Sequence, residues 1–302
     1  MKAVAKKDKF SDKEIKKHIN SLIPETREVL TAPKEERVVF AMTDKFINYS
    51  RAKEILDYFE LLIKLPRKPR MKGVLLYGES GTGKTMIVRH FFEKFAPKEN
   101  EDEDADEIPV VLVETPTEPK ERMIYDKIAD TLGFPYKKSE DILDKERNIE
   151  HYVNFMRVKM IIFDEFHNIL NGTAIQQRRV LSVIKSLTNR LWIPIVLVGT
   201  KDVLVAVETD DEIKRRFDPY QLHPWSEDKD FLRLLRTVEA TLPLRLPSYM
   251  WKDEELVRWL IKSTDGILSE IIHLIKLGAR RAILSGEERV TLKILKEANP
   301  FD

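Results

Sequence analysis

The 302-residue sequence contains no cysteine, which excludes disulfide bonds and zinc sites built on thiolates. It has no apolar run near the roughly 20 residues that span a bilayer, and no signal-peptide pattern opens it. Its six histidines show no paired spacing of metal ligands. Because 52 basic residues nearly cancel 51 acidic ones, overall charge does not indicate a nucleic-acid binder, and any such surface must be local. These absences predict a globular, cytoplasmic protein without a membrane partner.

A glycine-rich segment directly follows an apolar run. The run, Gly73–Tyr77, has the length and the β-branched or aromatic character of a buried strand. The next residues, Gly78–Thr85, read GESGTGKT and fit G-x-x-x-x-G-K-[ST] at every fixed position. The residues that follow have helical periodicity. A glycine-rich turn that matches by chance is the alternative, but the order of strand, loop and helix favours a phosphate-binding loop.

The residue types of this motif suit a nucleoside triphosphate. Glycines at 78, 81 and 83 allow successive N–H groups to point at an anion, and the helix that begins near Gly83 adds its positive end. Lys84 is placed to reach the β- and γ-phosphates, and the Thr85 hydroxyl to ligate Mg²⁺. We therefore predict ATP and Mg²⁺ as cofactors. The predicted cofactor-binding residues are Gly78, Glu79, Ser80, Gly81, Thr82, Gly83, Lys84, Thr85 and Met86.

A pair of carboxylates ends another apolar run. The run, Lys159–Phe163, predicts the third strand and leads into Asp164 and Glu165. Mg²⁺ needs a hard anionic oxygen, which Asp164 supplies, and hydrolysis needs a second carboxylate to orient the attacking water, which Glu165 supplies. Strands often end in acidic residues, so the pattern alone is a weak signal, and it indicates a catalytic site because it follows a phosphate loop. We predict Thr85 and Asp164 as metal ligands, and Lys84 and Glu165 as catalytic residues.

Further catalytic candidates follow the fourth predicted strand, Ile193–Val198. Thr200 is placed to contact the γ-phosphate or the attacking water, although an ordinary turn threonine is an equal alternative. Arg215 and Arg216 precede an aromatic residue. An arginine from a neighbouring subunit can stabilise the transferring phosphoryl group and accelerate the reaction by about 10³–10⁵. The alternative is a solvated basic end of a helix. We predict all three residues as catalytic.

The remaining patterns predict three regions. Residues 1–45 are polar and lysine-rich, which predicts a solvated, partly disordered tail or, as the alternative, an arm that touches a partner or a phosphate backbone. Strand patterns cease after Ser226, and helical patterns occupy 228–241, 253–263, 267–284 and 291–298. We therefore predict a basic, helical N-terminal extension over 1–45, an α/β ATPase subdomain over 46–225 and a small helical subdomain over 226–302.

The order of these features resembles that of an AAA+ ATPase, and five blocks resemble the TniB and TnsC type of transposition regulator. The blocks are FINYSRAKEILDYFELLIKLPRKPRMKGVLLYGESGTGKT at 46–85, FDEFHNILNGT at 163–173, NRLWIPIVLVGT at 189–200, RRFDPYQLHPW at 215–225 and LPLRLPS at 242–248. Together they place the resemblance over residues 30–298. The resemblance implies an α/β P-loop domain with a parallel five-stranded sheet in the order 5-1-4-3-2, followed by a small C-terminal α-helical lid.

The resemblance also implies a function. ATP binding would assemble subunits into a ring or a helical filament on duplex DNA, in a bacterial or archaeal cytoplasm. The assembly would recruit a transposase and work with a target-selection protein, and hydrolysis would disassemble it. Thr200 would read the γ-phosphate, and Arg215 or Arg216 would act in trans. Contacts to the DNA backbone, independent of sequence, would lie in loops after the second predicted strand, the apolar run 109–113, and before the third. The candidates there are Lys120, Arg122, Lys145 and Arg147.

One residue departs from the AAA+ pattern. Many AAA+ lids carry an arginine in G-x-x-R, whereas Gly266–Ser269 ends in serine, which predicts weak coupling of lid to nucleotide and slow hydrolysis. His167 matches the family block, and we predict a structural, hydrogen-bonded side chain for it. The alternative functions are a helicase loader, an origin-recognition-like initiator, and a nucleotide-dependent scaffold or signalling switch with negligible hydrolysis. Glu165 argues against a switch, which has no need of that carboxylate.

Overall fold

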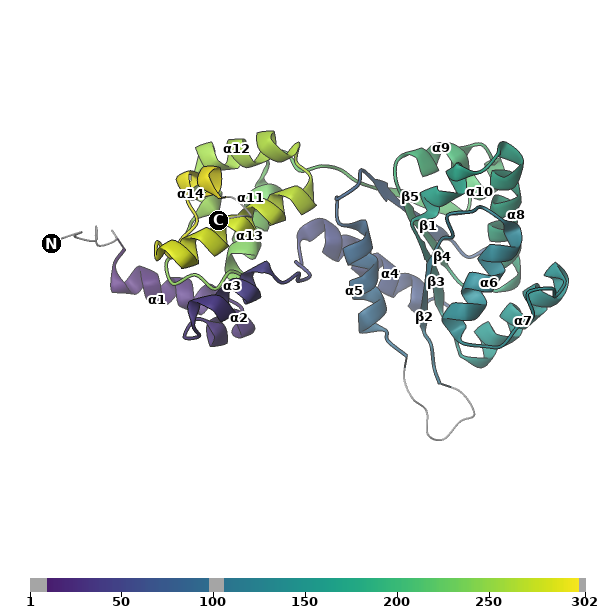
Figure 1. Cartoon of the computed structure of the whole chain (residues 1–302). Coiled ribbons are helices and arrows are strands. Elements are labelled where there is room, and N and C mark those ends of the chain that lie inside the picture. The colour runs from purple at the N-terminus through teal and green to yellow at the C-terminus, as the bar shows by residue number, and fades with distance from the viewer. Residues whose placement is uncertain (1–9, 98–105, 299–302) are drawn as a thin grey trace. The chain divides into compact units, whose positions relative to one another are not determined.

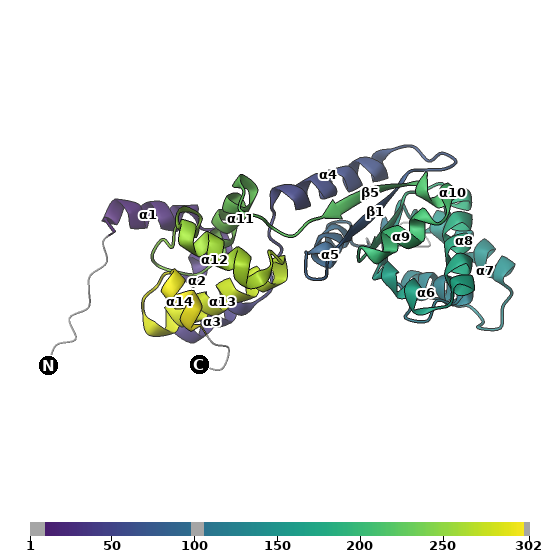
Figure 2. The ribbon, with the colours of Figure 1, turned by 90° about the horizontal axis from the view of Figure 1, so that it is seen from above.

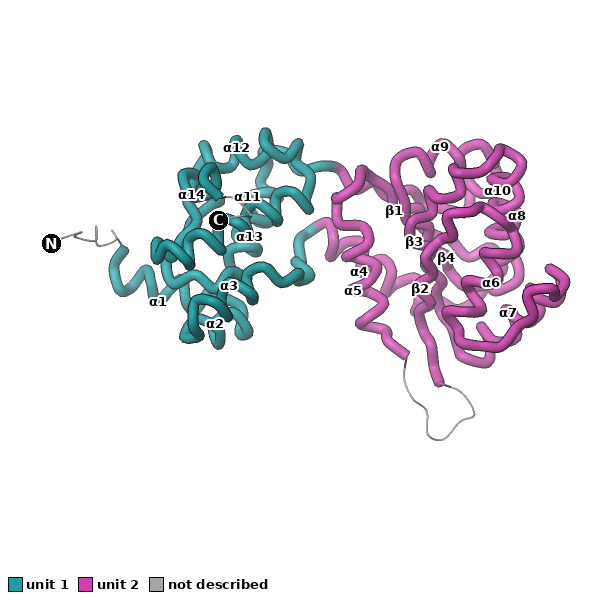
Figure 3. Tube along the Cα trace, viewed as in Figure 1, with its two compact units in different colours: residues 1–50, 224–302 teal, residues 51–223 magenta. Residues whose placement is uncertain are grey.

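The computed structural model describes residues 10–97 and 106–298, arranged in two compact units (Figure 3). Arg51–His223 form the first, here called the sheet unit. The second, here called the helical unit, combines the chain up to Ser50 with the chain from Pro224 onward. The first lysines of the predicted N-terminal extension lie outside the described residues. Within the described ranges, no helix is both long and apolar enough to cross a membrane.

A parallel five-stranded sheet forms the centre of the sheet unit (Figure 1). Its order, β2-β3-β4-β1-β5, is the one that the resemblance implied, so the predicted fold class is confirmed. The strands are β1 (Gly73–Gly78), β2 (Val110–Glu114), β3 (Met160–Asp164), β4 (Ile195–Gly199) and β5 (Phe217–Leu222). All residues of β3 and β4 are buried. Burial on both faces explains why these strands read as unbroken apolar runs.

Strand β5 is the one strand that hydrophobic pattern alone did not predict. Its sequence, FDPYQL, contains Asp218 and Pro219 and does not alternate cleanly. Pro219 lies opposite Leu75 of β1. Because proline has no N–H to donate, it is tolerated on an edge strand, and β5 is an edge of this sheet. The edge position therefore explains both the polar composition and the missing signal.

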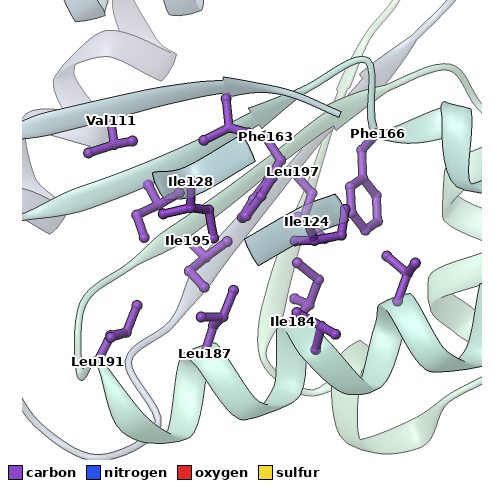
Figure 4. Close-up of a cluster of buried hydrophobic side chains, with 14 of the residues drawn as sticks. Val111, Ile124, Ile128, Phe163, Phe166, Ile184, Leu187, Leu191, Ile195 and Leu197 are labelled. Atoms are coloured by element: carbon purple, nitrogen blue, oxygen red, sulfur yellow. The ribbon is translucent and has the colours of Figure 1, made fainter. Parts of the chain in front are cut away.

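Helices pack around the sheet and close its core. They are α4 (Ser50–Lys64), α5 (Lys84–Lys94), α6 (Glu121–Leu132), α7 (Ile142–Phe155), α8 (Ala174–Arg190), α9 (Asp202–Glu208) and α10 (Asp211–Lys214), with a 3₁₀ turn at Phe166–Asn171. Figure 4 shows Ile124 and Ile128 of α6 and Ile184 and Leu187 of α8 gathered against the side chains of the strands. Thr173 caps α8 through a capping box with Gln176, which fixes the start of that helix.

The helical unit contains all four helices predicted after residue 226 (Figure 2). They are α11 (Lys229–Ala240), α12 (Glu254–Thr264), α13 (Leu268–Ser285) and α14 (Leu292–Glu297), with a 3₁₀ turn at Met250–Lys252. Three more helices come from the N-terminal segment: α1 (Asp12–Ser21), α2 (Pro24–Val29) and α3 (Lys34–Met42). The interpretation of this segment as a partly disordered tail is therefore wrong for residues 12–42. Its buried apolar residues include Leu22, Leu30 and Ala41.

A buried ion pair fastens α3 inside the helical unit. Arg37 is fully buried, and its guanidinium bonds the carboxylate of Glu288 through two nitrogens. The same guanidinium donates to the carbonyl oxygen of Pro243, with Nε at 3.1 Å. A buried charge is tolerated only when it is paired and hydrogen-bonded, and these partners meet that need. The partners lie more than 200 residues away in sequence, so no local pattern reveals them.

Candidate functional site

The glycine-rich loop joins β1 to α5 at the carboxyl edge of the sheet. Gly81 and Gly83 have φ values of 75° and 97°, in the left-handed region where a side chain is strained. At Gly78 the need is space, because an added Cβ would lie 2.4 Å from the carbonyl oxygen of Leu222. Thr82 is buried, and its hydroxyl donates to the carbonyl of Glu79 at 2.8 Å. Each glycine of the motif thus meets a specific demand of the backbone.

The ammonium group of Lys84 lies inside this loop. Its Nζ donates to the carbonyl oxygens of Gly78, at 3.0 Å, and Glu79, at 2.7 Å. Burial lowers the pKa of Lys84, and the negative charges of Glu165 and Asp164 act in the opposite direction. Those carboxylates therefore lie close enough to act electrostatically on the lysine. The loop, the lysine and the carboxylate pair share one site, as the two motifs predict.

The first turn of α5 presents backbone donors toward the loop. Gly83 is the N-cap, so the N–H groups of Lys84, Thr85 and Met86 belong to the turn that has no intrahelical partners. Such groups, together with the positive end of the helix, bind anions. The Met86 side chain is exposed, so its predicted contact to the nucleotide rests on the backbone alone. Ser80, at the tip of the loop, is exposed as well.

Asp164 is a buried carboxylate with one oxygen available. It is 7% exposed, and its Oδ1 accepts the N–H of Glu165 at 2.9 Å. Within the described residues it forms no ion pair. A buried carboxylate without a cation is costly, and a divalent cation relieves that cost. Asp164, at the end of β3, and the Thr85 hydroxyl, in the first turn of α5, are the groups that would hold a Mg²⁺ ion.

Glu165 occupies a strained position beside Asp164. Its φ of 52° lies in the left-handed region, which non-glycine residues seldom adopt and which is common at functional sites. The side chain is 44% exposed, and its Oε2 lies 3.2 Å from Nε2 of His167. Nδ1 of His167 is buried and has no hydrogen-bond partner in the described part of the chain. The predicted structural histidine thus contacts the predicted catalytic carboxylate. The spacing D-E-x-H at 164–167 is the sequence signal for this contact.

The end of β4 contributes a further polar group. Because β4 lies between β1 and β3, Thr200 follows a strand that is flanked by both motifs. Its hydroxyl donates to Asp202 Oδ2 at 3.3 Å. The next residue, Lys201, pairs with Glu79 of the glycine-rich loop, with 2.6 Å between Nζ and Oε1. Sequence reasoning missed this pair, since nothing local connects residues 122 positions apart.

The structure separates the two candidate arginines. Arg216 is 6% exposed, and its Nη1 donates to Thr188, at 2.6 Å, and to Asn189, at 2.8 Å. It also pairs with Glu212. Arg215 is exposed and forms no such bond with any described residue. The prediction for Arg216 needs correction, because its guanidinium is already engaged inside its own subunit, and only Arg215 is left as a candidate to reach a neighbour.

Two of the predicted DNA contacts precede or open α6. Lys120 is the residue before α6 and is 59% exposed, paired with Glu118. Arg122 lies in the first turn of the helix, and its Nη1 donates to the carbonyl oxygens of Lys138 and, at 2.7 Å, of Glu140. Lys120 can therefore reach a phosphate, whereas Arg122 holds the loop before α7.

The other two predicted DNA contacts lie on α7, a helix that the sequence pattern did not reveal, and not in a loop. The Lys145 side chain is 3% exposed and pairs with Asp126 at 2.5 Å. Its ammonium also lies over the ring of Tyr136. This corrects the prediction for Lys145, because a buried and paired lysine presents no charge to DNA. Arg147 is 72% exposed and pairs with Asp144 at the surface.

This fold and site define a class of protein. A parallel sheet in the order 2-3-4-1-5, a phosphate loop after β1, a carboxylate pair after β3 and a polar residue after β4 are the features of a P-loop ATPase of the AAA+ type. Within that class the chain belongs to the TniB family. The model of that family, described as bacterial TniB protein, matches residues 37–227. No curated protein matches the sequence.

Solved structures with this fold include ORC and CDC6P proteins. The ORC2 protein of Aeropyrum pernix, in ADPNP and ADP complexes, matches with a TM-score of 0.57 and 15% identity, over 86% of this chain and 70% of that one. The ORC1 protein of the same organism, in complex with DNA, gives 0.54 and 14%, over 86% and 68%. CDC6P from Pyrobaculum aerophilum gives 0.56 and 16%, over 83% and 67%. At these identities the likeness shows the fold alone.

Proposed function

We propose that this protein is an ATP-dependent, DNA-binding regulator of DNA transposition that acts in the cytoplasm. ATP binding at Gly78–Thr85 joins subunits into a ring or helical filament on duplex DNA. The assembly recruits a transposase and works with a target-selection protein, and hydrolysis takes it apart. The observation that carries the proposal is that the glycine-rich loop with Lys84 and the Asp164–Glu165 pair follow β1 and β3 at the same edge of one parallel sheet, in a chain of the TniB family. The DNA complex of the A. pernix ORC1 protein, which shares the fold, adds support.

Each site residue has a role in this proposal. Thr85 and Asp164 hold Mg²⁺, which neutralises charge on the phosphates when it is bound. Glu165 orients the attacking water and takes up its proton, and Thr200 reads the γ-phosphate. Arg215 reaches the site of a neighbouring subunit, for which its side chain is suited because it is exposed and has no partner among the residues that the structure describes.

The remaining predicted parts keep their roles in the proposal. Residues 46–225 act as the ATPase and 226–302 as the lid. Ser269, exposed in the first turn of α13, stands where an arginine is common, which supports slow hydrolysis. Lys120 and Arg147 contact the DNA backbone without reading sequence. Both are exposed and held only by surface ion pairs, which are worth little and are easily exchanged for a phosphate.

Lys84→Ala tests the assembly. We expect the unmodified protein to form rings or filaments with duplex DNA and a non-hydrolysable ATP analogue in electron micrographs, and Lys84→Ala to sediment as a monomer. The reason is that the Lys84 ammonium inside the loop binds the β- and γ-phosphates, and alanine cannot replace that positive charge. Lys94→Ala is the matched control, on the same helix, at a surface pair with Glu60. Assembly of Lys84→Ala equal to that of the control would overturn the proposal.

Glu165→Gln separates an ATPase from a nucleotide-dependent switch. Because the substitution keeps the shape and removes the base, turnover should fall by about 10²–10⁴ while binding of a fluorescent ATP analogue persists. Phosphate release measures the first effect, and fluorescence titration the second. Glu93→Gln is the control, since Glu93 is an exposed carboxylate on α5, outside the glycine-rich loop. Unchanged turnover in Glu165→Gln would favour the switch.

A further inference from the structure

The helical unit contains a hollow of about 640 Å³, lined by α1, by α11 and by the segment around Met250. This volume lies within the range of about 300–1,000 Å³ that is typical of ligand sites. None of its lining residues belongs to the nucleotide site described above. Its lining combines positively charged and aromatic side chains: Lys17, Arg236, Tyr249, Trp251 and Lys252.

The cations of the hollow have no ion-pair partner among the described residues. This holds for Lys17, Arg236 and Lys252, whereas Arg233 and Arg258 on α11 and α12 are paired with nearby carboxylates. Lys17 and Arg236 reach the hollow from different helices. Three unpaired positive charges around one concavity attract an anion with more than one negative group.

The acidic and polar groups nearby are already engaged. Glu239 lines the hollow but is 4% exposed, and its carboxylate accepts the N–H groups of Ser248 (2.8 Å), Tyr249 (3.0 Å) and Met250 (3.3 Å). Burial raises its pKa, and those hydrogen bonds act against the rise. Glu14, whose charge acts on Lys252, accepts from Ser11 in a capping box.

His18 is the other titratable group of the lining. Its ring is buried, and Nε2 bonds the carbonyl oxygen of Leu244 at 2.9 Å. The ring is therefore part of the wall of the hollow, and its Nε2 is not available to a ligand because it already bonds Leu244. Three cations, Lys17, Arg236 and Lys252, therefore stand against the two carboxylates of Glu239 and Glu14, and the charge that the hollow offers to a ligand is positive.

Two aromatic rings stand among these cations. Tyr249 and Trp251 pack edge to face, with centroids 5.4 Å apart. The Lys252 ammonium lies 4.4 Å from the Tyr249 ring, while the Arg236 guanidinium is 5.9 Å from the Trp251 ring. Cations beside ring faces are the arrangement with which proteins bind single strands of nucleic acid, since phosphates pair with the cations and bases stack on the rings. Trp251, with the more distant cation, is the available platform.

We propose that this hollow binds a single-stranded segment of nucleic acid. Phosphates lie against Lys17, Arg236 and Lys252, and one base stacks on Trp251. An acidic peptide satisfies the cations but brings no planar group for the tryptophan, so the aromatic faces favour the nucleic acid. The site goes beyond the proposed function, because it requires neither ATP nor assembly and lies on residues outside the nucleotide site.

The test measures fluorescence anisotropy of a labelled oligothymidine of roughly ten nucleotides, without ATP, on the full chain. The double variant Arg236→Glu/Lys252→Glu should weaken binding at least tenfold. It should also reduce the slope of log affinity against log salt by about 0.7 for each lost phosphate contact. Trp251→Ala should weaken binding by about 5- to 150-fold, the range of one lost base stack, and Trp251→Phe should recover much of it.

Controls keep the outcomes distinct. Arg258→Glu and Lys293→Glu change charge elsewhere in the same unit, on α12 and α14, and should leave binding and slope near those of the unmodified protein. Lys84→Ala should still bind the oligonucleotide, so failure of the ATP-gated assembly leaves this result readable. Thermal melts verify that each variant folds. Equal affinity of all variants, or displacement of the oligonucleotide by polyglutamate with no effect of Trp251→Ala, would overturn the proposal.

Discussion

In the sheet unit the charged residues Lys84 and Glu165 follow the ends of buried strands and stay partly accessible, whereas in the helical unit Arg37 is fully buried against Glu288. The first arrangement arises because a parallel sheet ends all its strands at one edge, where polar side chains meet a ligand. The second arises because helices from both ends of the chain must be fastened together. A charge removed from the sheet edge should therefore change chemistry at little cost in stability, and removal of the buried, paired charge of Arg37 should do the reverse.

The contrast between an accessible and a buried, paired charge is tested most sharply by the adjacent arginines, both of which lie in the sheet unit. Arg215→Ala should lower turnover of the assembled protein by about 10³–10⁵ without shifting the melting temperature, because an exposed finger acts only on a neighbour. Arg216→Ala should instead lower the melting temperature, since it leaves Glu212, Thr188 and Asn189 without their shared donor. Steady-state hydrolysis on duplex DNA and thermal unfolding measure the two effects.

Mixing variants tests whether Arg215 acts between subunits. In mixed assemblies of Arg215→Ala with Glu165→Gln, some interfaces combine an intact arginine with an intact carboxylate, so part of the turnover should return. Neither variant alone should recover it. No recovery on mixing, or a loss of turnover in Arg216→Ala with unchanged melting, would contradict the assignment of Arg215.

The next largest effect is expected at the buried pair of the helical unit. Arg37→Ala leaves the Glu288 carboxylate without its cation and should destabilise that unit by about 3–5 kcal/mol. Urea unfolding followed by tryptophan fluorescence measures this, because Trp225, Trp251 and Trp259 all lie in the helical unit. Arg258→Ala is the control: its pair with Glu254 is exposed and should be worth less than about 1 kcal/mol. Equal effects of the two substitutions would show that the buried pair stabilises the helical unit no more than an exposed one.

The same contrast explains which features the sequence could predict. Strands buried on both faces read as apolar runs, and the phosphate loop needs glycines at fixed spacing, so β1, β3 and Gly78–Thr85 are visible in local sequence. The chemistry of Asp164 and Glu165 is visible for the same reason, because carboxylates that follow an apolar run lie at the sheet edge. The helices after residue 226 were predicted from their periodicity.

The features that the sequence did not reveal depend on contacts between residues that are far apart in sequence. The partners of Arg37 and Arg216 come from other elements of the fold. The local charge pattern therefore suggested a disordered tail for the segment of Arg37 and a contact to a neighbouring subunit for Arg216, and it gave no sign that either side chain is buried. Lys145 is buried for the same reason, by Asp126 of α6. Strand β5 was concealed by Pro219, which only an edge position permits. Local pattern therefore predicts elements and motifs, while tertiary partners decide whether a charge is functional or structural.

The smallest effect concerns Lys45, a charge in the helical unit that lacks a carboxylate partner among the described residues. Its Nζ is buried without a hydrogen bond and lies 2.9 Å from the centroid of the Phe40 ring. Burial, aided by the charge of Lys276, lowers the pKa of Lys45 to about 8 from 10.5. Between these values the unfolded chain binds more protons than the folded one, so the contribution of Lys45 to stability rises with pH through that window.

Lys45→Met should remove this rise and, by replacing a buried ammonium with an apolar group of similar length, increase stability near neutral pH by about 1 kcal/mol. Urea unfolding from about pH 7 to about pH 10 measures both effects. Lys262→Met, on the exposed face of α12, is the control and should keep the rise. If the rise persists in Lys45→Met, the buried ammonium is not its source. A gain in stability at Lys45, set beside a large loss at Arg37, would show that it is the partner, and not burial alone, that makes a charge in this unit stabilising.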